Sequence, residues 1–539
     1  MASPFVSLKN ASALIIDDYQ GVRSMLREFV RYMGIPRADT ASNGKEATRL
    51  LQECKYDIVI CDYNLGPGAN GQQVLEEAKL RQWVGVSSIW VMVTAEKTTD
   101  MVMGAAEIKP DDYLLKPINQ ELLQSRLEKL LARKLVLAPV EAAIRAKDLA
   151  AAVAQCDVLL TAQASNQQEI LRIKSDLLLT LGDYAAAKKL FELVLAVRSV
   201  AWAKTGLGRV AYFAQDFAGA VQLFQQVLQD SPMYVEAADW LAKSFEAMNE
   251  LALAQESWAQ AAKLSPNSPL RQKSLADSSY KNGDLDSAQA AFEKTIKISE
   301  FSTHKNPAVY SRLAQVLTDR NAPDDALKIL KQCKAEFKYN SAAALQTAAA
   351  ESLVYQKMGQ TEKGLAAIQA AEKLFDQMEG KASTELVLEL AQTQLKLGRH
   401  DKACSLLGEV IKNNHENADV SNQVQALFAS HALGEEGLAL IQASRQEVID
   451  INNRGINLAK QGEFELAVKL LRSAVLQLPS NEVVMLNLCG LLLAQLKKVG
   501  FKEALKTEAR DLLERVHLLN PGNKKYYAYA LVLARLQPK

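Results

Sequence analysis

The chain has 539 residues and a formal net charge of +1, with 63 basic and 62 acidic side chains. Because an ordinary domain has roughly 100–200 residues, either several domains or a repeat array must account for this length. The balanced charge provides no global field for a polyanion, so we expect neither a nucleic acid nor a membrane surface as a partner.

The cysteines and the apolar segments indicate the cellular compartment. The six cysteines are scattered without the paired spacing of a zinc site or a disulfide framework, which fits a reducing compartment. The first residues, MASPFVSLKN, lack the apolar core of a signal peptide, and charged residues interrupt every apolar stretch well before the ~20 residues of a membrane span. We therefore expect a cytoplasmic protein.

Along the first 130 residues, short apolar runs alternate with helical patterns. The apolar runs cover residues 14–16, 57–61, 89–93 and 113–115, with a weaker run at 38–41. The helical patterns cover residues 20–33, 44–54, 71–81, 99–107 and 119–132. Short continuous apolar runs are typical of strands that are buried on both faces in a parallel sheet. The pattern therefore predicts a five-stranded, doubly wound α/β domain with a flavodoxin-like sheet.

Polar residues stand at the carboxyl ends of the predicted strands, where a parallel sheet brings them into one crevice. The residues are Asp17, Asp18, Asp62, Thr94 and Lys116. Three carboxylates in one crevice repel one another, so a divalent cation is implied, and oxygen ligands favour Mg²⁺. Two cation charges and the ammonium group of Lys116 then balance the three carboxylates.

The segments IIDD, VICDYNLGPGANG, VMVTAE and DDYLLKP occur in this order, and together they resemble the receiver domain of two-component response regulators over about residues 11–132. The resemblance implies that Asp62 accepts a phosphoryl group from a sensor histidine kinase or a histidine phosphotransfer protein. It also implies that Mg²⁺ or Mn²⁺ is held by Asp17 or Asp18, by Asp62 and by the backbone carbonyl of Asn64.

The same resemblance assigns roles to the other residues of the crevice. Lys116 and Thr94, with the neighbouring Ala95, would bind phosphoryl oxygens, and Tyr113 would rotate as part of the switch. The Lys116–Pro117 peptide bond would be cis, with Pro117 as the cis-proline. Two local alternatives remain open, because Thr94 also fits a helix cap and Tyr113 also fits an ordinary strand aromatic residue.

This sequence departs from the receiver pattern in two places. The loop that follows Asp62 lacks the usual Met-Pro pair and is one residue longer, and residues 108–111 replace the common Gly-Ala. Neither change removes a catalytic group. The first change is expected to alter the dephosphorylation rate, and the second is expected to alter how the fourth helix couples to the site.

From residue 138 onward, the sequence repeats with helical spacing. An alanine follows each turn, the residue twelve positions earlier is small, and the residue four positions later is large and apolar. The alanines are Ala187, Ala220, Ala254, Ala288, Ala326, Ala403 and Ala467. Small residues let antiparallel helices approach closely, and the large residue fills the groove to the next hairpin.

This pattern resembles the tetratricopeptide repeat over about residues 140–537, which implies an all-α solenoid with a concave face that binds a protein target. We therefore predict a receiver domain over residues 1–134, a linker with an atypical first hairpin over 135–165, well-matched repeats over 166–300 and divergent repeats over 301–539. Arg209, Lys243 and Lys273 are candidates for the groove, where they would face an acidic partner. An ordinary solvated helix face is the alternative for these three residues.

The combination predicts a response regulator that is not an enzyme apart from the phosphoryl chemistry of Asp62. After residue 135 we find no P-loop, metal-ligand cluster or nucleophile motif. The receiver would gate the binding of an unidentified protein by the repeats. The alternative function is a scaffold that is independent of phosphorylation and whose receiver serves as a homodimer contact.

Overall fold

The computed structural model describes residues 11–84, 88–95, 110–163, 166–378, 382–499, 502–520 and 522–535. The helix predicted over residues 99–107 lies outside these ranges. The chain forms two compact units, Met1–Val309 and Tyr310–Lys539. Along the described ranges, no helix has both the length and the apolar character that a membrane span requires.

The first unit begins with a parallel five-stranded sheet in the order β2-β1-β3-β4-β5. The strands are β1 (Ser12–Ile16), β2 (Arg37–Ala41), β3 (Ile58–Asp62), β4 (Ile89–Thr94) and β5 (Asp112–Leu115). The helices of this part are α1 (Gln20–Tyr32), α2 (Gly44–Glu53), α3 (Gly71–Leu80) and α5 (Gln120–Arg145). This arrangement confirms the predicted doubly wound α/β fold.

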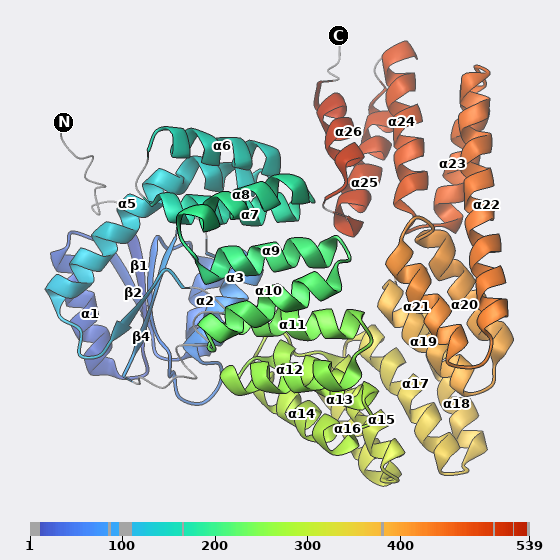
Figure 1. The fold of residues 1–539 in the computed structure, drawn as a ribbon, viewed down its shortest axis with the longest axis horizontal. Coiled ribbons are helices and arrows are strands. Elements are labelled where there is room, and N and C mark those ends of the chain that lie inside the picture. Colours follow the sequence, from blue (N-terminus) through green and yellow to red (C-terminus); the bar gives the residue numbers. More distant parts are fainter. Residues whose placement is uncertain are drawn as a thin grey trace. The chain divides into compact units, whose positions relative to one another are not determined.

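Both faces of the sheet are buried, because helices cover each of them (Figure 1). Alternate residues of a strand point to opposite faces. In β3, Ile58 and Ile60 therefore belong to the core under α1 and α5, whereas Val59 and Cys61 belong to the core under α2 and α3. The continuous apolar runs of the sequence follow directly from this two-sided burial.

The last receiver helix is longer than the sequence predicted. Helix α5 continues beyond residue 134 as far as Arg145, with Pro139 inside it (Figure 1). In its second half, Leu137 and Val140 are buried together with Ala152 and Cys156 of the next helix. The first helical hairpin is therefore built partly from the receiver's own final helix.

The remainder of the first unit consists of helical hairpins. Their helices are α6 (Leu149–Thr161), α7 (Gln167–Thr180), α8 (Tyr184–Val197), α9 (Ala201–Phe213), α10 (Phe217–Asp230), α11 (Val235–Ala247), α12 (Leu251–Leu264), α13 (Pro269–Lys281) and α14 (Leu285–Ile298). An aspartate caps the second helix of several hairpins by accepting a hydrogen bond from the third following backbone N–H, as Asp183, Asp216 and Asp284 do.

The packing of the hairpins explains the repeat pattern. All seven alanines that define the repeat are completely buried. A Cβ atom added to Gly208 would lie 2.4 Å from Phe224 of the same hairpin, and one added to Gly206 would lie 2.2 Å from Phe191 of the preceding hairpin. At both glycines, large side chains of neighbouring helices come close to the backbone of α9.

The second unit continues the helical pattern. Its helices are α15 (Pro307–Asp319), which begins at the boundary, α16 (Pro323–Glu336), α17 (Ser341–Lys357), α18 (Thr361–Asp376), α19 (Thr384–Lys396), α20 (His400–Asn413), α21 (Ala418–Ala429), α22 (Gly434–Lys460), α23 (Phe464–Gln477), α24 (Glu482–Val499), α25 (Glu503–Leu519) and α26 (Lys524–Arg535). Helix α22 has 27 residues and contacts both α21 and α23. Because one helix serves two hairpins, the repeat pattern is weak near Glu435.

Candidate functional site

The polar residues that follow the strands meet at one edge of the sheet. Asp17 directly follows β1, Asp62 and Thr94 are the last residues of β3 and β4, and Lys116 directly follows β5. The side chains of Asp17, Asp62 and Thr94 lie in the protein interior, with residue exposures of 1%, 7% and 6%. The crevice at the carboxyl ends of the strands is thus lined by two carboxyl groups and a hydroxyl group that have little contact with water.

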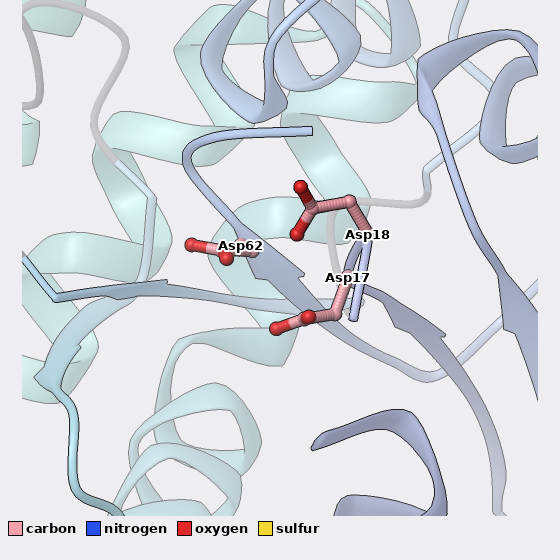
Figure 2. Close-up of side chains that lie close together, drawn as sticks. All are labelled: Asp17, Asp18 and Asp62. Atoms are coloured by element: carbon pink, nitrogen blue, oxygen red, sulfur yellow. The ribbon is translucent and has the colours of Figure 1, made fainter. Parts of the chain in front are cut away.

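Three carboxylates gather in this crevice. One oxygen each from Asp17, Asp18 and Asp62 lies within 4.8 Å of the other two. Figure 2 shows that all three side chains point to the same side; Asp18 is the exposed one of the three. An all-oxygen donor set with this spacing suits a hard divalent cation, which would also offset the mutual repulsion of the carboxylates.

The ammonium group of Lys116 connects two of these carboxylates. Its Nζ atom donates to Asp62 Oδ2 at 2.7 Å and to Asp17 Oδ2 at 2.8 Å. Burial lowers the pKa of Lys116, but the hydrogen bonds to the two carboxylates outweigh this effect and leave its pKa raised. Burial raises the pKa of Asp62, and Lys116 opposes the rise only in part. The lysine therefore remains charged beside the candidate nucleophile.

The residues predicted to form the switch surround the same edge of the sheet. The backbone N–H of Lys116 donates to the carbonyl of Thr94 at 2.8 Å, and Ala95 is exposed next to it. Tyr113 is half-buried in β5, and burial raises the pKa of its hydroxyl. The Lys116–Pro117 peptide bond is cis.

Gly71 is a site residue whose role no sequence motif indicated. A Cβ atom at this position would lie 2.0 Å from the carbonyl oxygen of Asp62, which is far closer than two atoms can approach. Its N–H donates to the carbonyl of Tyr63 at 2.8 Å, and a capping box formed by Asn70 and Gln73 fixes the first turn of α3. The start of α3 is therefore pressed against the end of β3.

Helix α3 also contacts the helical repeats of the first unit. Glu76 Oε1 lies 2.8 Å from His304 Nε2, and Glu76 Oε2 accepts a hydrogen bond from Ser302 Oγ at 2.9 Å. Gln73 Nε2 donates to the carbonyl of Ile298 at 3.4 Å. The hydrogen bond with Glu76 raises the pKa of His304. We call residues 298–304 the docking segment.

Two further features lie where the receiver meets the repeats. A cleft of about 650 Å³ lies beside the docking segment and is lined by Tyr63 and Asn70 on the receiver side and by Asn267 and Phe301 on the repeat side. In α5, Arg133 makes a forked ion pair with Glu169 of α7. The loop that follows Asp62 therefore borders the repeats directly.

The three groove candidates from the sequence lie on α9, α11 and α13, and each already has an intramolecular partner. Arg209 forms ion pairs with Asp176 at 3.2 Å and with Glu236 at 3.4 Å. The Nζ atom of Lys243 lies 4.5 Å from the ring centre of Trp240. Lys273 pairs with Asp277 of its own helix at 2.9 Å. A partner at these positions would have to compete with the existing contacts.

Comparison with known protein families agrees with this architecture. Residues 13–128 match the response regulator receiver domain. Tetratricopeptide repeats match residues 174–232, 205–269 and 385–414. The chain therefore carries a receiver domain at its N-terminal end and tetratricopeptide repeats in its C-terminal region.

Individual relatives match the receiver part. Chemotaxis protein CheY-3 of Vibrio cholerae is 27% identical over 125 residues, which cover 23% of this chain and 95% of that protein. Chemotaxis protein CheY of Pseudomonas aeruginosa is 28% identical over 120 residues, which cover 22% of this chain and 95% of that protein. A receiver domain of the CheY type indicates a two-component response regulator.

Solved structures resemble each part separately. The structure of chemotaxis protein CheY4 of Vibrio cholerae has 24% sequence identity and a TM-score of 0.21, and the match covers 22% of this chain and 98% of that chain. The crystal structure of MamA has 18% sequence identity and a TM-score of 0.28, and the match covers 32% of this chain and 95% of that chain.

Proposed function

We propose that Asp62 accepts a phosphoryl group from a sensor histidine kinase or a histidine phosphotransfer protein, and that the state of the receiver gates protein binding by the repeats. The observation that carries the proposal is the contact of Lys116 with Asp62 and Asp17, inside a cluster of three carboxylates. We propose that the protein performs this role in the cytoplasm.

The proposed chemistry is a simple transfer. A carboxylate oxygen of Asp62 forms a bond to phosphorus while the bond from phosphorus to the donor's histidine nitrogen breaks, and the released imidazole takes a proton from solvent. Lys116 would neutralise charge that develops on the phosphoryl oxygens, which is the main contribution a protein makes to phosphoryl transfer. Thr94 would donate its hydroxyl to a second phosphoryl oxygen.

The proposed site includes Mg²⁺, held by Asp17, Asp18, Asp62 and the backbone carbonyl of Asn64. The cation would supply positive charge against the phosphoryl oxygens. Support comes from the oxygen-only donor set and from the mutual distances of the three carboxylates.

The contact between α3 and the docking segment supports the gating part of the proposal. Because Gly71 lies against the carbonyl of Asp62, a change at Asp62 would act directly on the first turns of α3. These turns carry Gln73 and Glu76, which contact the docking segment. A local change of charge would thereby act on an element that touches the repeats.

The phosphoryl-transfer step is tested with the purified full-length chain, Mg²⁺ and a small phosphoryl donor such as phosphoramidate. We expect intact-mass spectrometry to detect one added phosphoryl group in the wild type and none in Asp62→Asn. Asp511→Asn is the matched control, because Asp511 is an exposed aspartate in the repeats. Equal phosphorylation of Asp62→Asn and wild type would refute the assignment.

The gating step is tested by amide hydrogen exchange with and without the donor. We expect exchange in α3 and in the docking segment to change on phosphorylation of the wild type and to stay constant in Asp62→Asn. Unchanged exchange in a wild-type sample that is demonstrably phosphorylated would contradict gating through this contact.

A further inference from the structure

The second unit contains a cavity that the sequence did not indicate. It has a volume of about 490 Å³ and is lined by α15, α17 and α19, which are the first helices of three consecutive hairpins. Ala349, Ala350 and Leu353 of α17 contribute apolar side chains to it. Its size lies in the range of roughly 300–1,000 Å³ that is usual for ligand sites.

Three cationic side chains line this cavity: Lys357 of α17 is exposed, and the other two come from the flanking helices. Arg312 belongs to α15 and Lys396 to α19. Within the described ranges, neither residue has a hydrogen bond or an ion pair. They therefore differ from Arg209 and Lys273, whose charges are already compensated by acidic neighbours.

The surroundings of Lys396 favour the arrival of an anion. Burial lowers its pKa, and the positive charge of Arg312 acts in the same direction, while the negative charge of Asp319 opposes them. The other acid of the cavity, Glu389, already accepts a hydrogen bond from Gln346 at 2.6 Å. A desolvated ammonium group without a close counter-ion gains most from a carboxylate that binds to it.

A polar group adds to the site. In the part of the chain that the structure describes, the buried Oγ atom of Ser311 in α15 has no hydrogen-bond partner. Ser311 lines the cavity next to Arg312. A buried hydroxyl usually has a partner, so a ligand that enters the cavity would complete its hydrogen bonding.

We infer that this cavity binds an acidic peptide segment of a partner protein, with the carboxylate side chain of an Asp or Glu between Lys396 and Arg312 and an adjacent apolar side chain against α17. The inference rests on the proposed role of the repeats in binding a protein, and it names the chemistry of the partner. A peptide fits better than a small anion, because the cavity has an apolar wall beside its cationic groups.

The test is a selection of random peptides on the immobilised full-length chain. The peptides are displayed with blocked C-termini, so that only side chains can supply a carboxylate. We expect the wild type to enrich peptides in which Asp or Glu stands next to an apolar residue. Absence of this enrichment, or failure to select any peptide, would overturn the inference.

Variants of the cavity residues then test whether the carboxylate of a selected peptide binds in the cavity. A selected peptide, labelled with fluorescein and amidated, should bind Lys396→Met and Arg312→Gln about tenfold more weakly in anisotropy titrations, as expected for loss of a charge-assisted hydrogen bond. Lys373→Met is the matched control, because Lys373 is exposed on α18 and does not line the cavity. Thermal unfolding verifies that each variant is folded. Equal affinity of Lys396→Met and wild type would overturn the inference.

The selection is performed with and without the phosphoryl donor, while mass spectrometry records phosphorylation of Asp62 in the same sample. A chain that is phosphorylated but selects no acidic peptide in either state contradicts only the cavity assignment. A chain that selects acidic peptides but is not phosphorylated contradicts only the proposed receiver chemistry.

Discussion

Glu76 of the receiver domain and His304 of the helical repeats form an ion pair in which Oε1 and Nε2 lie 2.8 Å apart. The two residues are far apart in the sequence, and both lie in the first unit of the chain. Glu76 stands on α3, whose first residue touches the backbone of Asp62. The pair thus joins a helix that begins against the candidate phosphoryl acceptor to the docking segment.

This ion pair predicts a pH dependence. The hydrogen bond with Glu76 raises the pKa of His304 above its usual value of about 6.5. A raised pKa in the folded state means that the pair stabilises the contact fully below about pH 6.5 and that this stabilisation is lost as the pH rises through the folded pKa. In the wild type, amide protection of the docking segment should therefore decrease as the pH rises above about 6.5, after correction for intrinsic exchange.

Glu76→Gln supplies the comparison for this prediction. The variant keeps the size of the side chain but removes the charge, so the docking segment should be less protected at low pH and should respond less to pH. Glu128→Gln in α5 is a suitable control, because the Glu128 side chain is exposed and its hydrogen bond is to Gln124 of the same helix. The same pH response in wild type and Glu76→Gln would rule out the ion pair as its source.

A second prediction concerns Gly71. In Gly71→Ala the new Cβ atom would lie 2.0 Å from the carbonyl oxygen of Asp62, so α3 must shift away from β3. We expect the receiver to lose about 1–3 kcal/mol of stability, the usual cost of overpacking, and the rate of phosphorylation to fall. Denaturant unfolding and the mass assay measure the two effects.

Gly434→Ala is the matched control for Gly71→Ala. Gly434 is the first residue of α22, and a Cβ atom at this position would meet no other atom within 4 Å. Alanine is the better helix former, so this variant should keep or slightly raise stability. If Gly71→Ala were as stable and as readily phosphorylated as Gly434→Ala, the close approach of α3 and β3 would have no role.

The sequence predicted the acid cluster well, because parallel strands place the residues at their carboxyl ends side by side. Asp17, Asp62 and Lys116 come from three separate segments, but their positions relative to the apolar runs were enough to bring them together. The sequence also predicted the repeats, because each buried alanine recurs at a fixed spacing from a small and a large residue.

Other features of the structure have no signal in the local sequence. The continuation of α5 beyond residue 134 was missed, because a proline such as Pro139 normally marks the end of a helix. The pairing of Glu76 with His304 depends on how the hairpins return to the receiver, which no short pattern encodes. The cavity between Arg312 and Lys396 likewise depends on the stacking of three helices.

A third prediction concerns the core of the repeats. Phe224 is completely buried and packs where Gly208 leaves room, so Phe224→Ala should destabilise the hairpins around α10 by about 3–5 kcal/mol. In a repeat array each hairpin depends on its neighbours, so hydrogen exchange should report the loss first in α9 to α11. Leu476→Ala, at a side chain that is 83% exposed, should have little effect. Comparable losses in the two variants would contradict the predicted importance of this contact.

The last prediction concerns the acid cluster. Asp17, Asp18 and Asp62 repel one another, and Lys116 compensates only part of their charge. A divalent cation that binds the folded receiver must stabilise it, by about 2.7 kcal/mol when its concentration is a hundred times its Kd. Added Mg²⁺ should therefore raise the midpoint of thermal unfolding of the receiver, and a chelator should reverse the rise.

Asp18→Asn separates cation binding from general charge effects. Without Mg²⁺ the variant should be at least as stable as the wild type, because one repelling charge is gone and Asp18 has no part in the lysine contacts. With Mg²⁺ the order should reverse, because the cation loses a ligand and the midpoint rises less. Asp511→Asn should respond to Mg²⁺ as the wild type does. Only a cation bound at the cluster makes the effect of Asp18→Asn on stability change sign with Mg²⁺. If Mg²⁺ raised the unfolding midpoint equally in all three proteins, it would act elsewhere.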